Sequence, residues 1–84
     1  MIKHTTTWLN FIQIGDTGKT LLLQVRNKEN NLQIGVIKWY GAFRQYSFYP
    51  SPETVFEKKC LKDISEYLQQ LMDEHKAKKT NENV

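Results

Sequence analysis

The fold of this chain is decided by residues 34–50, IGVIKWYGAFRQYSFYP, which hold six of its ten aromatic side chains. Ile34 to Tyr40 is rich in β-branched and aromatic residues, and Arg44 to Tyr49 is aromatic at nearly every second position, which is typical of strands. Residues 40–43, YGAF, are short and contain glycine, as a hairpin connection does. We therefore predict two antiparallel strands, near residues 32–40 and 43–49.

The side chains of this hairpin sort onto two faces if Gly41-Ala42 is a two-residue loop with Tyr40 opposite Phe43. The first face then carries Ile37, Trp39, Arg44, Tyr46 and Phe48. The second carries Ile34, Val36, Lys38, Tyr40, Phe43, Gln45, Ser47 and Tyr49. We predict that a helix covers the first face, where Arg44 would make a cation–π contact with Trp39. A single helix covers one side of a sheet, so the second face is left to solvent or to a partner. A one-residue slip in the loop would exchange the two faces.

Two further strands are expected upstream. One lies near residues 20–27 and precedes the polar segment NKENN. The other lies near residues 6–14 and connects to it through residues 15–18, GDTG, whose two glycines suit a turn with positive φ. Residues 1–18 thus contribute at most one extra N-terminal strand to an antiparallel meander.

A long helix is predicted over residues 55–78. Thr54 and Glu57 have the spacing of a capping box at its start. Three- and four-residue spacing then places five apolar residues on one stripe, flanked by Cys60 and Tyr67: Leu61, Ile64, Leu68, Leu71 and Met72. This stripe should pack on Ile37, Trp39, Tyr46 and Phe48. The fold class is therefore α+β: a three- to four-stranded antiparallel meander packed on one face by a C-terminal helix. Residues 1–84 should form a single domain whose tail, residues 79–84, frays.

Charge and composition narrow the function classes. Residues 1–52 hold six Lys or Arg against Asp16 and Glu29, whereas residues 53–84 hold six against seven acids. An excess of four is compatible with nucleic acid but is weak for a dedicated polyanion binder. The lone Cys60 excludes an intramolecular disulfide, and we find neither a signal peptide nor a membrane span. We expect a cytoplasmic protein in a reducing, cytosolic setting, with no membrane partner.

The sequence contains no complete catalytic, metal or cofactor motif. Gly18-Lys19-Thr20 ends like a phosphate loop, but position 13 is glutamine where the pattern needs glycine, and a strand follows where a helix is needed. His4 and His75 lie at opposite ends of the sequence, so no metal-ligand spacing exists. Cys60 has no evident base in the sequence and is expected to be an inert thiol. We expect no enzyme activity, no cofactor, no metal and no small-molecule substrate.

The same stretch carries a family resemblance. IKWYGAFRQYSFYP followed by TVFEKKCLKDI resembles short, uncharacterised phage and prophage proteins that share I-K-W-Y, R-Q-Y, an aromatic-Pro pair, T-[IV]-F and C-L-x-D-I. The resemblance covers roughly residues 20–72 and leaves the N-terminal 18 residues outside it. It implies a phage or mobile-element origin, and therefore a place in the host cell cytosol, but it does not indicate an activity.

The leading functional hypothesis is a non-catalytic module that binds a protein, either a host or defence factor or a second copy, through the second face. Aromatic side chains there would supply contact area at low entropic cost. The candidate binding residues are Lys38, Tyr40, Phe43, Gln45, Tyr49 and Arg26. The alternative is nucleic-acid binding, in which Lys38, Arg26, Lys28 and Gln45 contact phosphates and base edges while Tyr40 or Phe43 stacks on single-stranded bases. At the level of fold alone, strands packed on a C-terminal helix also resemble small DNA-binding domains of some integrases.

Overall fold

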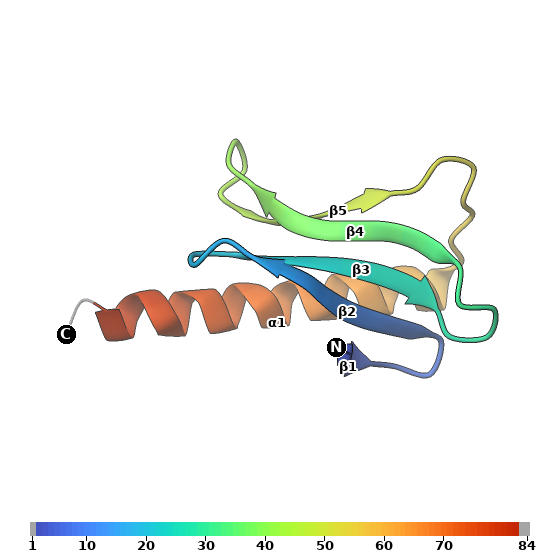
Figure 1. The fold of residues 1–84 in the computed structure, drawn as a ribbon, viewed down its shortest axis with the longest axis horizontal. Coiled ribbons are helices and arrows are strands. Elements are labelled where there is room, and N and C mark those ends of the chain that lie inside the picture. The colour runs from blue at the N-terminus through green and yellow to red at the C-terminus, as the bar shows by residue number, and fades with distance from the viewer. Residues whose placement is uncertain (1, 83–84) are drawn as a thin grey trace.

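The computed structural model describes residues 2–82, with side chains through Ala77. Five strands form one antiparallel sheet in the order β1-β2-β3-β4-β5, and a single helix lies across one of its faces (Figure 1). The elements are β1 (Ile2–Thr5), β2 (Leu9–Asp16), β3 (Leu21–Asn27), β4 (Gln33–Tyr40), β5 (Gln45–Pro50) and α1 (Lys58–Glu82). The predicted α+β meander is confirmed, but the predicted number of strands, three to four, was wrong because the sheet has five.

The extra strand arises from a turn inside the segment predicted as one strand over residues 6–14. The Thr6 N–H donates to the Leu9 carbonyl at 2.8 Å, and the Leu9 N–H donates to Thr6 Oγ1 at 3.1 Å. A hydroxyl that accepts a backbone donor two or three residues on stabilises a turn against a continuous strand. The chain therefore folds back on itself, and β1 pairs with β2 at the edge of the sheet.

The segment GDTG forms a hairpin turn between β2 and β3. Asp16 Oδ1 accepts the Gly18 N–H at 2.7 Å, and Gly18 has a φ of 90°, which glycine adopts without strain. Thr17 Oγ1 accepts the Thr20 N–H at 3.0 Å. The residues that imitate a phosphate loop thus serve a turn that leads into β3.

The β4–β5 connection is longer than predicted. Tyr40 pairs with Gln45, so residues 41–44 form the loop, and Arg44 has the left-handed φ of 53°. The predicted pairing of Tyr40 with Phe43 was therefore wrong by two residues, and an even shift leaves the two faces unchanged. Arg44 is exposed in the loop and makes no cation–π contact with Trp39 within the described residues. The His75 ring, 4.7 Å from the Trp39 ring, lies against that side chain instead.

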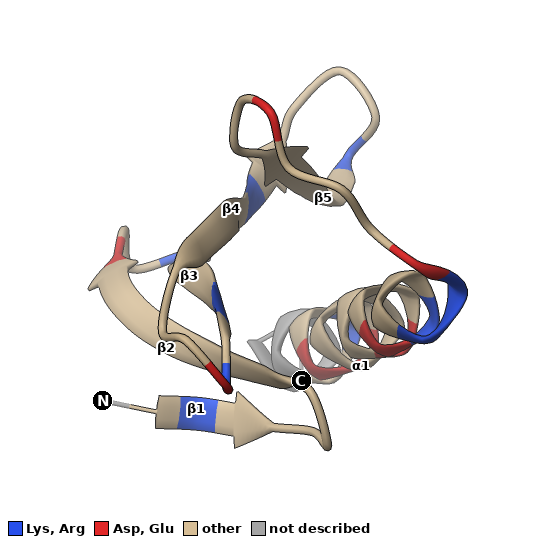
Figure 2. Cartoon of the chain, turned by 90° about the vertical axis from the view of Figure 1, so that its right-hand side faces the viewer, with Lys and Arg blue, Asp and Glu red and all other residues tan. Residues whose placement is uncertain are grey.

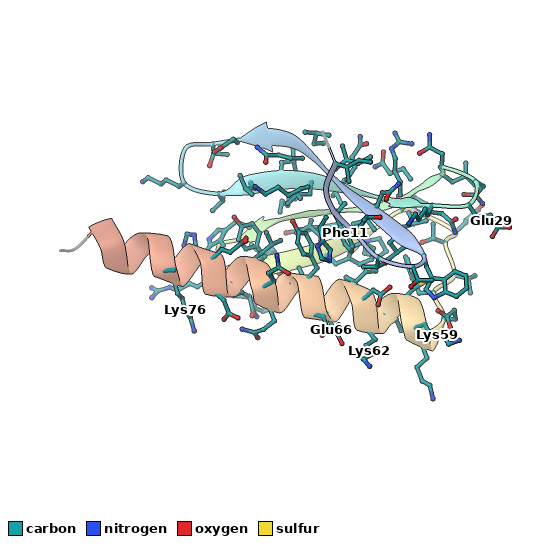
Figure 3. The ribbon with its side chains drawn as sticks, turned by 90° about the horizontal axis from the view of Figure 1, so that it is seen from below. Phe11, Glu29, Lys59, Lys62, Glu66 and Lys76 are labelled. Carbon is teal, nitrogen blue, oxygen red and sulfur yellow. The ribbon has the colours of Figure 1, made fainter. Side chains whose placement is uncertain are left out.

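The core lies between the helix side of the sheet and α1. Its buried residues are Leu9, Phe11, Leu23, Val25, Ile37, Tyr46, Ile64, Tyr67 and Leu71, with Trp39, Phe48, Leu68 and Met72 packed at the margin. The predicted packing of Ile64, Leu68 and Leu71 is confirmed. Leu61, predicted in the stripe, is 51% exposed, because the buried stripe runs through Ile64, Tyr67 and Leu71. Tyr67 is central because two rings pack on it: the His4 ring from β1 and the Phe11 ring from β2, each with its centre 4.5 Å from the centre of the Tyr67 ring. Phe11 lies between the sheet and α1 (Figure 3).

The helix begins one turn later than predicted. Thr54 does not cap it, since its hydroxyl donates to the Ser51 carbonyl at 2.7 Å. The Glu57 carboxylate instead accepts the Cys60 N–H at 2.7 Å, and backbone hydrogen bonds from Lys59 and Cys60 lower the pKa of Glu57. The helix continues beyond the expected end near residue 78 to Glu82, and residues 83–84 of the predicted frayed tail lie outside the described residues.

Candidate functional site: the open sheet face

One side of the five-stranded sheet is not covered by any described element, because α1 packs on the other side (Figures 1 and 2). We call this side the open face. Direct cross-strand pairing places one row of side chains across its full width: Ile2, Ile12, Gln24, Val36 and Tyr49. Strand alternation adds Leu22, Arg26, Lys38, Tyr40, Gln45 and Ser47. A half-exposed sheet surface of this kind is a natural place for a ligand.

Four of the six predicted binding residues gather at one corner of the open face. The Lys38 ammonium lies 4.6 Å from the centre of the Tyr49 ring. The Tyr40 ring lies 6.4 Å from the Tyr49 ring and 4.8 Å from the Phe43 ring. We call Lys38, Tyr40, Phe43 and Tyr49 the aromatic corner. Phe43 reaches it from the loop and is 68% exposed, and Gln45 lies beside it as the cross-strand partner of Tyr40.

The sixth predicted residue, Arg26, is on the open face but away from the aromatic corner. It lies on β3 opposite Asn10, where its Nε donates to Gln24 Oε1 at 3.1 Å and its Nη1 donates to the Asn31 carbonyl at 2.8 Å. These two bonds fix the guanidinium near the β3–β4 turn. Lys28, named for the nucleic-acid alternative, lies in that turn and donates to the Thr6 carbonyl at 3.2 Å.

Apart from Arg26, sequence reasoning missed the β1–β3 half of the open face. Ile12, Leu22 and Gln24 lie there, all partly exposed. The alternation of LNFIQI and LLLQVR carries the signal, because Phe11, Leu23 and Val25 are the buried members of the same alternation. Assigning only the hairpin residues to faces left this half unread.

Charge is sorted between the two sides of the molecule. The open face carries Arg26 and Lys38 and no acidic side chain among the described residues. Asp16 at the end of β2 and Glu29 in a turn are the acids of the sheet half, while the others lie on α1 and the segment leading into it (Figure 2). Part of the basic excess of residues 1–52 therefore lies on a sheet surface whose described residues include no acid.

Three further polar features of the described residues lie away from the open face or outside the aromatic corner: a small cavity, the acidic and histidine side chains, and Cys60. A cavity of about 120 Å³ between the β2–β3 turn and α1 is bordered by Asp16, Lys19, Tyr46, Glu74 and His75, among others. Among the described side chains, residues 2–77, no group of three His, Cys, Asp or Glu is placed to hold a metal ion. Burial, followed by the hydrogen bond and charge of Glu57, raises the pKa of the Cys60 thiol, which disfavours the nucleophilic thiolate.

Within the described residues, no helix has the length and apolar character needed to cross a lipid bilayer. No family model matches the chain, and no solved structure matches it. It is 38% identical over 77 residues to the "uncharacterized 9.3 kDa protein" of Acholeplasma phage L2, an alignment that covers 90% of this chain and 99% of the phage protein. This agrees with the phage relationship that the sequence pattern implied. The chain belongs to the family of this small phage protein.

Proposed function

We propose that this chain is a non-catalytic binding protein whose open face takes a nucleic acid strand. The observation that carries the proposal is the charge of that face: its described residues include Lys38 and Arg26 but no acid, and exposed aromatic rings lie beside Lys38. A polyanion gains from such a surface because each neutralised phosphate releases counterions.

The aromatic corner offers the two kinds of contact that single-stranded nucleic acid makes with proteins, base stacking on aromatic rings and pairing of a phosphate with a cation. Tyr40 and Phe43 are 39% and 68% exposed, so their rings are accessible to unpaired bases. Each base that stacks on an aromatic ring contributes about 1–3 kcal/mol. Lys38, held above the Tyr49 ring, has its ammonium within the same corner and is available to a phosphate. Arg26, on β3, provides a second cation for a nucleic acid strand that crosses β3 and β4.

Fluorescence anisotropy with a labelled thymidine oligomer of about 15 nucleotides tests the proposal, and a matched duplex serves as competitor. Affinity should fall steeply between about 50 and 200 mM salt, and Lys38→Ala should reduce the slope of log K against log salt by about 0.7, one phosphate contact. Lys62→Ala is the matched control, because Lys62 lies on α1, pairs with Glu66 at 3.8 Å and points away from the sheet (Figure 3). Equal effects of the two substitutions, or no binding at low salt, would reject the proposal.

A protein partner is the second candidate, and the partly exposed aliphatic side chains of the open face favour it. Ile2 is 57% exposed, and Ile12, Leu22 and Val36 are partly exposed beside it. Aliphatic side chains gain little from phosphates but gain from a complementary apolar surface, on a host or defence factor or on a second copy. In that case Tyr40→Ala or Phe43→Ala should cost about 1–3 kcal/mol of binding, with little dependence on salt.

The two candidates separate in one further experiment. The immobilised chain is exposed to host lysate with and without nuclease, and captured material is compared between the natural chain and a Tyr40→Ala, Phe43→Ala variant. Protein retained after nuclease treatment and lost with the variant favours the second candidate. Light scattering of the purified chain shows whether that partner is a second copy.

A further inference from the structure

A groove runs between the last strand of the sheet and the helix, on the side away from the open face. It has a volume of about 410 Å³, and β5 and the loop before it form one wall. The other wall is α1, through Ser65, Leu68, Gln69 and Met72. Among the side chains that line the groove, none carries a charge: they are Phe43, Gln45, Tyr46, Ser47, Phe48 and the four helix residues.

The β5 wall presents backbone groups as well as side chains. β5 ends the sheet, so only its β4 side is paired. The Tyr46 N–H points away from β4, since it donates to Met72 Sδ at 3.3 Å, a weak acceptor. Backbone groups of an antiparallel strand alternate in direction, so the N–H and carbonyl of Phe48 point into the groove as well. The Ser51 N–H donates to Ile34 on β4, as this alternation requires.

An open strand edge beside a helix selects one kind of ligand. Only an extended backbone can pair with the Phe48 N–H and carbonyl while its alternate side chains reach the helix wall. Apolar side chains would contact Leu68 and Met72 there. A charged side chain would lose its hydration against neutral walls without gaining a partner, so the fitting segment is uncharged.

We propose that the β5–α1 groove is a strand-addition site for an extended, uncharged and partly apolar peptide segment of another protein. The part of β5 that lines the groove, residues 45–48, spans about 13 Å, which corresponds to four residues of such a segment. This proposal is independent of the proposed function, since its residues, apart from Phe43, Gln45 and Ser47 at the rim, lie on the side of the sheet away from the open face.

A second copy fits this groove less well than a single segment. An inserted strand must have both edges free, because β5 borders it on one side and α1 on the other. The β5 strand of a second copy already carries β4 on one edge and its own α1 beside the other. The occupant is therefore a segment that is unpaired before it binds.

The probe for this site is a phage-displayed library of random linear heptapeptides, selected on the immobilised natural chain. Enriched sequences are synthesised, labelled and measured by anisotropy. Gln69→Trp should weaken their binding at least about tenfold, because the indole fills the groove. Gln70→Trp is the matched control, since Gln70 is the next exposed glutamine of α1 and does not line the groove, and it should change affinity less than about twofold.

Hydrogen exchange provides a readout that a surface contact elsewhere would not move. On peptide binding, the Phe48 amide should become at least about tenfold slower to exchange, because strand addition pairs it. No enrichment over a resin control, enriched peptides rich in Lys, Arg, Asp or Glu, or an unchanged Phe48 amide would each overturn the proposal. So would peptides that bind Gln69→Trp normally but lose affinity with Tyr40→Ala, since these would occupy the open face. A dimer of the purified chain that Gln69→Trp dissociates would make a second copy the occupant and overturn the peptide assignment.

Discussion

Replacing Gly35 with alanine tests the packing of β4 against β5 most directly. A Cβ atom at this position would lie 2.5 Å from Cε1 and Cζ of the Phe48 ring and 2.7 Å from the Tyr49 carbonyl oxygen. Carbon atoms in contact prefer about 3.5–4.0 Å, so the ring and the strand would have to retreat by about 1 Å. The Phe48 ring has little room to do so, because the Phe56 ring packs edge-on against it at 5.4 Å.

The expected loss of stability is about 2–3 kcal/mol, the upper part of the range for an added methyl group in a packed site. A domain of 84 residues has about 4–13 kcal/mol in total, so this loss would be easy to measure. Alanine also restricts the unfolded chain relative to glycine, which works in the opposite direction. Gly41→Ala is the control for that effect, since a Cβ there meets no atom within 4 Å and Gly41 lies in an exposed loop.

Urea unfolding followed by tryptophan fluorescence gives the free energies, since Trp39 lies on the same strand as Gly35 and Trp8 lies between β1 and β2. In a double-mutant cycle, Phe48→Ala should remove most of the penalty of Gly35→Ala, leaving the contact with the Tyr49 carbonyl. A Gly35→Ala variant as stable as Gly41→Ala would refute the close approach of ring and backbone, and with it the register of Gly35 opposite Pro50.

Four further substitutions test the helix and the residue that caps its start. Leu71→Ala should cost about 2–5 kcal/mol in urea unfolding because Leu71 is 2% exposed, whereas Leu61→Ala at a 51% exposed position should cost well under half as much; equal costs would contradict the observed stripe. Cys60→Ala should leave ligand binding unchanged with a modest loss of stability, and loss of binding in a folded variant would contradict an inert thiol. Glu57→Gln should lower thermal stability at neutral pH. Because the folded-state pKa of Glu57 is lowered, the carboxylate stabilises the fold above its unfolded pKa, and the difference from Glu57→Gln should vanish as the pH falls through the folded pKa.

The side of the sheet on which each hairpin residue lies could be predicted from the sequence, although the loop length could not. Strand alternation places four residues on the helix side of the sheet: Ile37, Trp39, Tyr46 and Phe48. An error of two residues in the loop length leaves them on that side, because side chains alternate with a period of two. The longer loop requires a left-handed φ at Arg44. Such a φ can be expected from the sequence at glycine or asparagine but not at arginine. The aromatic corner was therefore predictable, with Phe43 reaching it from the loop.

Strand β1 could not be predicted, because its stability comes from contacts distant in sequence. Four residues, IKHT, carry no alternation that distinguishes a strand. His4 packs on Tyr67 and Phe11, and this tertiary contact fixes the strand at the edge. The same cause explains why Leu61 was chosen over Tyr67 for the buried stripe, since helical spacing alone does not reveal which flank β1 covers. The position of the acids could not be predicted either, because a net charge over residues 1–52 does not show on which side of the sheet each charged residue lies.

The Tyr67 hydroxyl gives the stability of the fold a specific dependence on alkaline pH. Tyr67 is 2% exposed and its hydroxyl has no hydrogen-bond partner among the described residues. Burial, and then the charge of Glu74, raises the pKa of Tyr67 to about 12, against about 10 in an unfolded chain. Below pH 10 both states keep the proton, whereas between about pH 10 and 12 only the unfolded chain loses it, so folding loses up to about 2–3 kcal/mol in that window.

Tyr67→Phe removes the unpartnered hydroxyl and should be neutral or stabilising by up to about 1 kcal/mol at pH 8. Because phenylalanine does not ionise, the advantage of the variant in urea unfolding should grow between about pH 8 and 11. An advantage that stays constant across this range would mean that the hydroxyl reaches solvent in the folded protein.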